Sequence, residues 1–370
     1  MYVESLSLDN FRNYERMHME LDPGVNLLYG DNAQGKTNAL EAVYLCSTTK
    51  SHRGGKDKEM VRFGSEDAHL RMIIVREGIH HKIDMHLKRS KAKGIAIDGI
   101  PIKRSSELFG PIHVICFSPE DLAMIKNGPG ERRHFLDMSL CQLSTVYLHD
   151  IAGYNKVVNQ RNNLLKQISV CPELKDTLDI WDMQLVSYGR RVIRARRELI
   201  GQISELMGPI HLRLTGGKEN LKLCYQPNVS EDDFEVQLFM KREQDIRSRI
   251  SQVGPHRDDF IFEVDGVDIR HFGSQGQQRS AALSLKLAEI ELVRQTIHDT
   301  PVLLLDDVLS ELDSSRQNHL LDSMGDIQTI VTCTGLDEFV SGRVKMDRLF
   351  HVESGNITLM EDTDLSLKKS

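Results

Sequence analysis

Strand-like patterns dominate the first 120 residues. Residues 25–29 form a short apolar run that ends at a glycine, as a buried strand does before a turn. Alternating positions around Glu77-Gly78 and around Asp98-Gly99 predict two hairpins, because such dipeptides favour tight turns. The apolar stretch at 112–117 predicts another strand. We therefore expect a sheet-rich first part of the chain.

A helical pattern replaces the strands between about 119 and 212. Apolar side chains recur every three or four positions through 147–168 and again through 174–192. Pro172 separates the two stretches, and Gly208-Pro209 is expected to end the second helix. The pattern predicts a helical hairpin.

The last third of the chain alternates between helix and strand. We expect a helix at 277–298, a strand at 302–305, a second helix from 314 and a strand at 329–332. Strands separated by helices are typical of a parallel sheet. The fold class predicted by this order is α/β.

Composition narrows the class of protein. The 370 residues carry 40% hydrophobic and 27% charged side chains, as an ordinary globular chain does. The six cysteines form no CxxC pair, which argues against a zinc ribbon and a disulfide framework. Neither a secretion signal nor a membrane-spanning run is visible, so we expect a cytoplasmic protein. The net charge of −7 argues against a surface that binds nucleic acid everywhere.

Residues 30–37 match the P-loop pattern G-x-x-x-x-G-K-[ST] between an apolar strand and a helical stretch. Glycines let such a loop curl until backbone N–H groups face phosphate oxygens. Lys36 is expected to reach the β- and γ-phosphates of ATP, and Thr37 to bind Mg²⁺. The predicted ATP-binding residues are Gly30, Asp31, Asn32, Ala33, Gln34, Gly35, Lys36 and Thr37.

A P-loop needs a second acid that holds Mg²⁺ at the end of a neighbouring strand. Residues 302–305 are apolar and are followed by Asp306 and Asp307. Asp306 is the predicted metal ligand. Asp307 is placed to orient and polarise the attacking water, so Asp307 and Lys36 are the predicted catalytic residues.

Two later stretches resemble loops of the ABC ATPases. Residues 272–279 form a serine-glycine turn that opens a helix and are similar to the signature loop, while 310–313 are similar to the D-loop with Asp313. The resemblance implies that the signature of one subunit binds the γ-phosphate on the P-loop of the other, giving an ATP-dependent homodimer. The implied signature residues are Ser274, Gln275, Gly276 and Gln277.

The whole pattern resembles the RecF family, in the SMC-like branch of the ABC ATPases. Residues 9–14, 30–42, 119–137, 254–259 and 305–316 carry the resemblance, and 119–137 is specific to that family. It implies an ABC-type P-loop ATPase head of mixed sheet and helices. The head would comprise residues 1–120 and 214–370, split by a helical arm at 121–213 that is too short for a long SMC coil.

The resemblance also implies a function. RecF proteins bind DNA as ATP-dependent dimers, associate with RecR, act with RecO, and help to load RecA at single-strand gaps. Roles in replication and SOS induction are implied as well. Two alternatives stay open from the residues: another SMC-like or OLD-type ATPase head, and a transporter cassette.

Some positions depart from the ABC pattern. No glutamine lies near 117–120, where the Q-loop falls, and Thr332-Cys333-Thr334 replaces the switch histidine. Asp307 is one methylene shorter than the usual glutamate. We infer slow ATP hydrolysis, which suits a switch. Arg12 and Asn13 resemble residues near the adenine in this branch, although an ordinary strand-end pair is the alternative.

Two basic clusters are candidates for DNA contact in spite of the negative net charge. Binding to phosphates needs only a local positive strip, although charge runs are often just solvated faces. The sequence shows no aromatic residues between the charges, so contacts with the backbone of duplex or gapped DNA are favoured over base stacking. The candidates are Lys88, Arg89, Lys91 and Lys93 in the first cluster, and Arg190, Arg191, Arg194 and Arg197 in the second.

Overall fold

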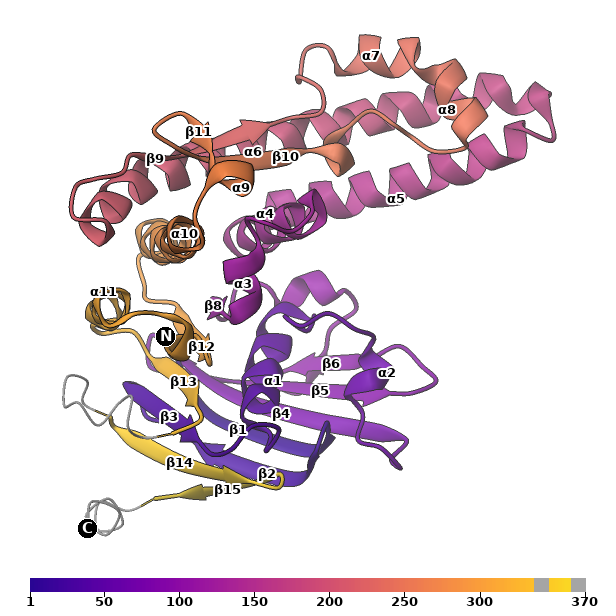
Figure 1. The fold of residues 1–370 in the computed structure, drawn as a ribbon. Coiled ribbons are helices and arrows are strands. Elements are labelled where there is room, and N and C mark those ends of the chain that lie inside the picture. The colour runs from indigo at the N-terminus through magenta and orange to yellow at the C-terminus, as the bar shows by residue number, and fades with distance from the viewer. Residues whose placement is uncertain (336–345, 361–370) are drawn as a thin grey trace. The chain divides into compact units, whose positions relative to one another are not determined.

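The computed structural model describes residues 1–335 and 346–360 (Figure 1). It divides into two compact units, one comprising Met1–Leu122 and Glu289–Ser370 and the other Ala123–Ala288. The sequence predicts an arm at 121–213. The second unit extends to residue 288 because β9 (Leu221–Gln226) packs along the arm helix α6 (Leu178–Leu214) and pairs with β10 (Asp259–Val264).

The first unit contains the predicted parallel sheet. Its strand order is β15-β14-β3-β13-β12-β8, and all neighbours are parallel except β14 and β15. β14 and β15 were not predicted. The strands are β3 (Val25–Tyr29), β8 (Val114–Phe117), β12 (Val302–Asp306), β13 (Thr329–Cys333), β14 (Arg348–Glu353) and β15 (Asn356–Leu359).

A second sheet in this unit is antiparallel, in the order β2-β1-β4-β5-β6-β7. Both predicted hairpins are present, and Glu77 and Asp98 adopt the positive φ values of 52° and 53° that such tight turns require. The strands are β1 (Tyr2–Phe11), β2 (Tyr14–Glu20), β4 (Asp67–Arg76), β5 (Ile79–Lys88), β6 (Gly94–Ile97) and β7 (Ile100–Pro101).

Helix α1 (Lys36–Thr48) lies between the two sheets (Figure 1). It contacts β4 and β5 on one side and β8, β12 and β13 on the other. Eleven of its residues are buried, including Glu41, so the helix has no wide polar face. The other α-helices assigned wholly to this unit among the described residues are α2 (Asp57–Met60) and α11 (Ser314–Met324).

The predicted helical hairpin forms the arm of the second unit. Helix α5 (Thr145–Ile168) begins at Ser144, whose side chain accepts a hydrogen bond from the Tyr147 N–H. The predicted end of the second helix at Gly208-Pro209 is wrong, since α6 continues to Leu214. His211 in that last part is fully buried and bonds to Ser284 and Glu219 at 2.9 and 3.1 Å, so tertiary packing offsets the cost of an internal proline.

Shorter elements complete the second unit. A three-stranded sheet has the order β11-β10-β9. The remaining α-helices and strands are α4 (Pro129–Leu143), α7 (Phe234–Met240), α8 (Arg242–Ser248), α9 (Ile269–Phe272) and β11 (Val267–Asp268). Two helices cross the unit boundary in sequence, α3 (Pro119–Ala123) and α10 (Gln275–Ile297).

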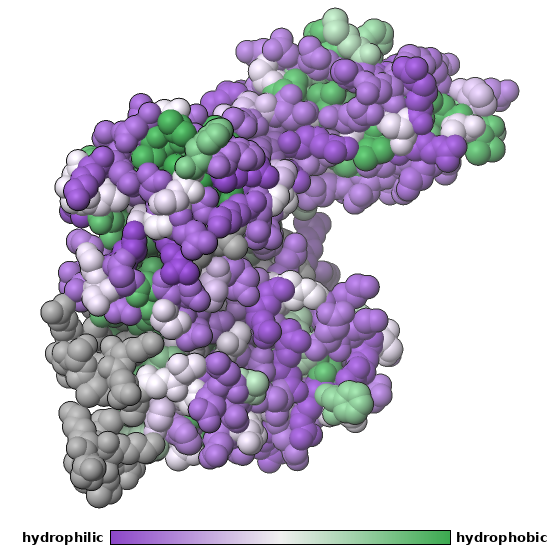
Figure 2. Space-filling model, viewed as in Figure 1, coloured by the Kyte–Doolittle hydropathy of each residue, from purple (hydrophilic) through white to green (hydrophobic). Residues whose placement is uncertain are grey.

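The visible surface is mostly hydrophilic, with apolar residues scattered across it (Figure 2). Among the described residues, no helix combines the length and apolar character needed to cross a membrane.

A buried ionic cluster fixes the distal part of the arm. The Arg161 side chain on α5 is fully buried, and its guanidinium donates to Asp182 on α6 and Asp245 on α8, each at 2.6 Å. Burial raises the pKa of Asp245, and the Arg161 charge opposes that rise. One arginine therefore holds three helices together.

We expect the substitution Arg161→Met to lower the free energy of unfolding of the arm by about 3–5 kcal/mol, because it leaves the buried Asp245 carboxylate without its cation and removes one of the two cations paired with Asp182. Trp181 is the single tryptophan of the chain and packs on the apolar cluster of the arm, so its fluorescence during urea denaturation reports this unit. Lys156→Met, an exposed change on the same helix, is the matched control. Equal urea midpoints for the two variants would contradict the proposed role of Arg161.

Candidate nucleotide site

The P-loop connects β3 to α1 through glycines that no other residue could replace without strain. Gly30 has φ 148°, and a Cβ there would lie 2.2 Å from the backbone oxygen of Val352. Gly35 has φ 125°, and its Cβ would meet the side chains of Asn13 and Tyr14 within 3.0 Å. The loop therefore curls tightly at both ends, as a phosphate-binding loop must.

Two neighbouring turns hold this loop from outside. Asn13 donates to the Gln34 carbonyl at 2.7 Å, and the buried Tyr14 hydroxyl donates to the Gly35 carbonyl at 3.0 Å. The Gln34 side chain in turn accepts from the Ser354 N–H at 2.6 Å, in the turn between β14 and β15. Asn13 therefore reaches the predicted loop, while Tyr14 and Ser354 were not predicted.

Lys36 lies at the first turn of α1 with its ammonium folded over the loop. It donates to the carbonyl of Asp31 at 2.8 Å and to that of Gly30. Burial lowers the pKa of this amine, and the nearby negative charges of Asp307 and Asp306 oppose that effect. The cation thus sits where the unpaired N–H groups of the helix start also gather, which favours an anion.

The predicted metal ligands meet at the ends of adjacent parallel strands. Asp306 ends β12 and is paired in register with Thr332 on β13, which lies beside β3. The Asp306 carboxylate accepts hydrogen bonds from the hydroxyls of Thr37 at 2.8 Å and Thr332 at 2.9 Å. Burial alone would raise the pKa of Asp306, but its polar neighbours outweigh this and lower it. The group is therefore held as a carboxylate.

Asp307 follows with a left-handed backbone, φ 54°, which turns the chain away from the strand. Its N–H donates to the Thr332 hydroxyl at 2.9 Å, and its buried Oδ1 has no hydrogen-bond partner among the described residues. Burial raises its pKa, and Asp306 adds to the rise while Lys36 opposes it. An unpartnered buried oxygen beside the hydroxyl and carboxylate oxygens of Thr37 and Asp306 fits a hydrated Mg²⁺ ion.

Sequence reasoning missed His52 at this site. Its Nε2 lies 3.8 Å from Asp306 Oδ2, which is an ion-pair distance and too long for a hydrogen bond. The imidazole packs edge-on against Tyr44, and neither ring nitrogen has a hydrogen-bond partner in the described part of the chain. Nothing in the spacing of His52 and Asp306, which are 254 residues apart, could have revealed the contact.

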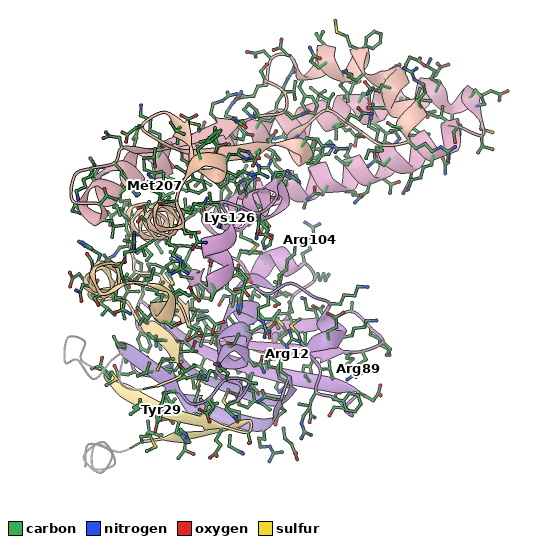
Figure 3. All side chains as sticks on the ribbon, viewed as in Figure 1. Arg12, Tyr29, Arg89, Arg104, Lys126 and Met207 are labelled. Carbon is green, nitrogen blue, oxygen red and sulfur yellow. The ribbon has the colours of Figure 1, made fainter. Side chains whose placement is uncertain are left out.

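Arg12, the predicted neighbour of the adenine, makes contacts within the protein; Figure 3 labels its position. Its guanidinium forms a bidentate pair with Glu41 at 2.6 and 2.7 Å and donates to the Glu59 carbonyl at 3.0 Å. Glu41 also accepts from Ser51. Burial would raise the pKa of Glu41, but Arg12 and Ser51 lower it. Arg12 therefore joins β1, α1 and α2.

The predicted signature residues open helix α10. Ser274 accepts from the Gln277 N–H at 3.2 Å, and the Gln277 side chain accepts from the Ser274 N–H at 2.9 Å, which is a reciprocal cap. Ser274 and Gln275 are exposed, while Gly276 is half-buried. The predicted D-loop residue Asp313 caps α11 by accepting from the Arg316 N–H at 3.0 Å. These loops are thus preformed helix starts.

The two basic clusters differ in how their charges are engaged. In the first, Lys88 and Lys91 are exposed, whereas Arg89 bonds to backbone carbonyls and Lys93 pairs with Asp57 at 3.0 Å. In the second, every candidate arginine has an acidic partner. Arg190 contacts Glu235, Arg191 forms a bidentate pair with Asp150, and Arg194 and Arg197 both contact Glu231.

Comparison with known proteins gives consistent results. A family model described as RecF/RecN/SMC N terminal domain matches residues 2–358. The chain is 59% identical to the DNA replication and repair protein RecF of Lachnoclostridium phytofermentans, over 96% of this chain and 99% of the relative. It is 57% identical to the protein of the same name from Lachnospira eligens, again over 96% and 99%.

Solved structures agree with this result. The recombination mediator protein RecF-ATPrS in the RecFOR pathway is 34% identical, with a TM-score of 0.90 over 97% of this chain and 98% of that one. An SMC head bound to the C-winged helix domain of ScpA is 15% identical, with a TM-score of 0.57 over 99% and 100%, which is a likeness of fold. The predicted ABC-type head and the predicted family resemblance are both confirmed.

We expect Thr332→Val to lower Mg²⁺-dependent ATP hydrolysis by about 10- to 100-fold, a typical cost of losing a residue that orients a metal ligand. Valine keeps the shape but removes the hydroxyl that bonds both Asp306 and the Asp307 N–H. Thr329→Val on the same strand is the control, because the Thr329 hydroxyl bonds only locally, to the Ile327 carbonyl. Steady-state phosphate release measures both, and equal rates would contradict the role of Thr332.

Proposed function

The chain belongs to the RecF family of DNA replication and repair proteins, and from this premise we propose that it is an ATP-dependent clamp that acts on DNA in recombinational repair. The observation that carries the proposal is the convergence of Lys36, Thr37 and Asp306 at the ends of parallel strands. Another SMC-like or OLD-type head, or a transporter cassette, would not account for 59% identity to a RecF protein over 96% of the chain.

Within this proposal the P-loop and the two acids act on ATP. The N–H groups at the start of α1 and the Lys36 ammonium bind phosphate oxygens, and Lys36 would leave the loop carbonyls to do so. Thr37 and Asp306 would hold Mg²⁺, which neutralises charge on the phosphates. Asp307 orients the attacking water. Because an aspartate reaches less far than a glutamate, hydrolysis is slow and the nucleotide serves as a switch.

The composite site would need a second copy of the chain. Ser274 is exposed at the start of α10. Its hydroxyl oxygen accepts a hydrogen bond from the Gln277 N–H, and its O–H can still donate one. That proton and the helix N-terminus suit an anionic phosphate of the partner. Support for ATP as the ligand comes from the solved RecF structures, which are described with ATP and ATPrS. The resulting dimer has two equivalent sites.

The partners of the clamp follow from the family. One similar structure is described as belonging to the RecFOR pathway, which supports RecR and RecO as partners. We propose that the protein binds DNA at single-strand gaps and junctions, promotes RecA loading with these partners, and supports replication and SOS induction. The cytoplasm is the compartment in which these tasks take place.

The first basic cluster is the better candidate for the DNA surface. Lys88 and Lys91 are exposed, so DNA phosphates could be their counterions. The arginines at 190–197 already neutralise Glu231, Glu235 and Asp150, and Arg196 is fully buried against Asp137 and Asp258. Recruiting them to DNA would require breaking these pairs.

We expect the protein to be a monomer without ATP and a dimer with ATP and Mg²⁺, as measured by light scattering after size exclusion. Asp307→Asn should lower hydrolysis by about 100-fold or more, because it removes the base, and should therefore prolong the dimer. Lys36→Met is the control that should stay monomeric, because it lacks the phosphate-binding cation. A monomer under every condition would refute the clamp.

We also expect the double substitution Lys88→Gln with Lys91→Gln to weaken DNA binding and to reduce the slope of log K against log salt by about two, roughly one for each lost phosphate contact. Arg194→Gln with Arg197→Gln, which removes the same charge from α6, is the comparison. Fluorescence anisotropy at several salt concentrations measures both. A larger loss for the α6 variant would assign the DNA surface to the arm instead.

A further inference from the structure

One aromatic side chain stands almost entirely in solvent. Phe63 is 97% exposed, in the turn between α2 and β4. Such exposure of a large apolar ring is unfavourable, because burial of a phenylalanine contributes about 1.5–3 kcal/mol. The protein itself could cover the ring only if the turn were free to fold back onto the rest of the chain.

The turn is not free to fold back. The Arg89 guanidinium donates to the carbonyls of Ser65 at 2.7 Å, Arg62 at 3.0 Å and Val61 at 3.3 Å. The Arg62 N–H also donates to the Asn10 carbonyl at 2.8 Å, and Gly64 takes the positive φ of 86° that closes the turn. The residues on both sides of Phe63 are therefore fixed, and their fixed backbone holds the ring in solvent.

The surroundings of this turn are strongly basic. Segments 50–67 and 86–93, which Arg89 and Lys93 tie together, carry nine lysines and arginines against four acidic residues. Five of the lysines are exposed, namely Lys50, Lys56, Lys58, Lys88 and Lys91. Figure 3 shows Arg89 beside α2, at the end of β5. The fold thus places beside the basic strip an aromatic ring that lies 25 residues away from Lys88 in sequence.

We propose that Phe63 stacks on a nucleobase of DNA at a junction between single and double strands, while Lys88 and Lys91 bind the adjoining phosphates. The inference rests on the proposed DNA binding and names the residue that would recognise the junction. A lone ring has a π-face that stacks on any base, and a junction is where a base lacks its stacking neighbour. A protein partner would need several adjoining apolar side chains, whereas Phe63 is flanked by Arg62, Gly64 and Ser65.

The test compares two DNA molecules and three substitutions of Phe63. Binding of the full chain with ATP is measured by anisotropy on a gapped duplex and on a continuous duplex of the same length. Phe63→Ala should raise the Kd for gapped DNA by about tenfold, the lower part of the range for loss of one stacked base, and leave the continuous duplex unchanged. Phe63→Leu should behave like Phe63→Ala, because it keeps an apolar side chain but loses the π-face. Phe63→Trp should bind gapped DNA as the parent does, because it keeps an aromatic ring.

Phe239→Ala is the matched control, because Phe239 is 68% exposed in the second unit and outside the basic strip. A 2-aminopurine base at the gap edge should be quenched by the parent protein and not by Phe63→Ala. Equal affinities of Phe63→Ala and parent for gapped DNA would overturn the inference. Equal losses on both DNA molecules would also overturn it. If the parent binds neither DNA, the proposed function itself has failed, before any variant is compared.

Discussion

The burial of α1 between two sheets is the constraint on which the first unit depends. A helix in that position has no solvent-facing side, so Glu41 is carried into the interior with its charge. A buried carboxylate needs a cation and further donors, and Arg12 and Ser51 supply them from β1 and from the segment after the helix. The same ion pair therefore fixes the P-loop helix against the antiparallel sheet. The glycines of the P-loop can then curl over a helix that is held in place.

Charge in this molecule has to be considered group by group. The net value of −7 says little, because the arginines of α6 and the lysines near β5 have different surroundings. The former are neutralised by carboxylates and stabilise the arm, while Lys88 and Lys91 face water. Of two positive runs of similar density in sequence, the one on α6 is thus paired with carboxylates, whereas the one near β5 keeps two exposed lysines beside the engaged Arg89 and Lys93.

Local features were predictable from sequence, and those that depend on distant pairing were not. The P-loop is a continuous stretch of eight residues, and Asp306 is the last residue of the strand that positions it, so spacing alone indicates both. Thr332 and His52 reach Asp306 only through strand register and the return of a loop, which no local pattern encodes. Pro209 predicts a helix end, because the contact between His211 and Ser284 that keeps the helix going joins residues 73 positions apart. The place of Phe63 beside the basic strip is not predictable from local sequence, because Arg89, which fixes its turn, lies 26 residues further along the chain.

The contacts of Arg12 have a consequence for genetics. Its guanidinium bonds to α1 and also to α2, and its N–H donates to the Met60 carbonyl at 2.8 Å. The segment from Ser51 to Arg62 is therefore held by hydrogen bonds along its length. It connects the nucleotide site with the turn of Phe63, which is proposed to bind DNA. Substitutions along this segment share partners, so their effects on activity should not be additive. An allele isolated for a defect in ATP hydrolysis should therefore also change DNA binding, and the reverse. Double-mutant analysis, rather than single alleles, is the form in which this segment can be dissected.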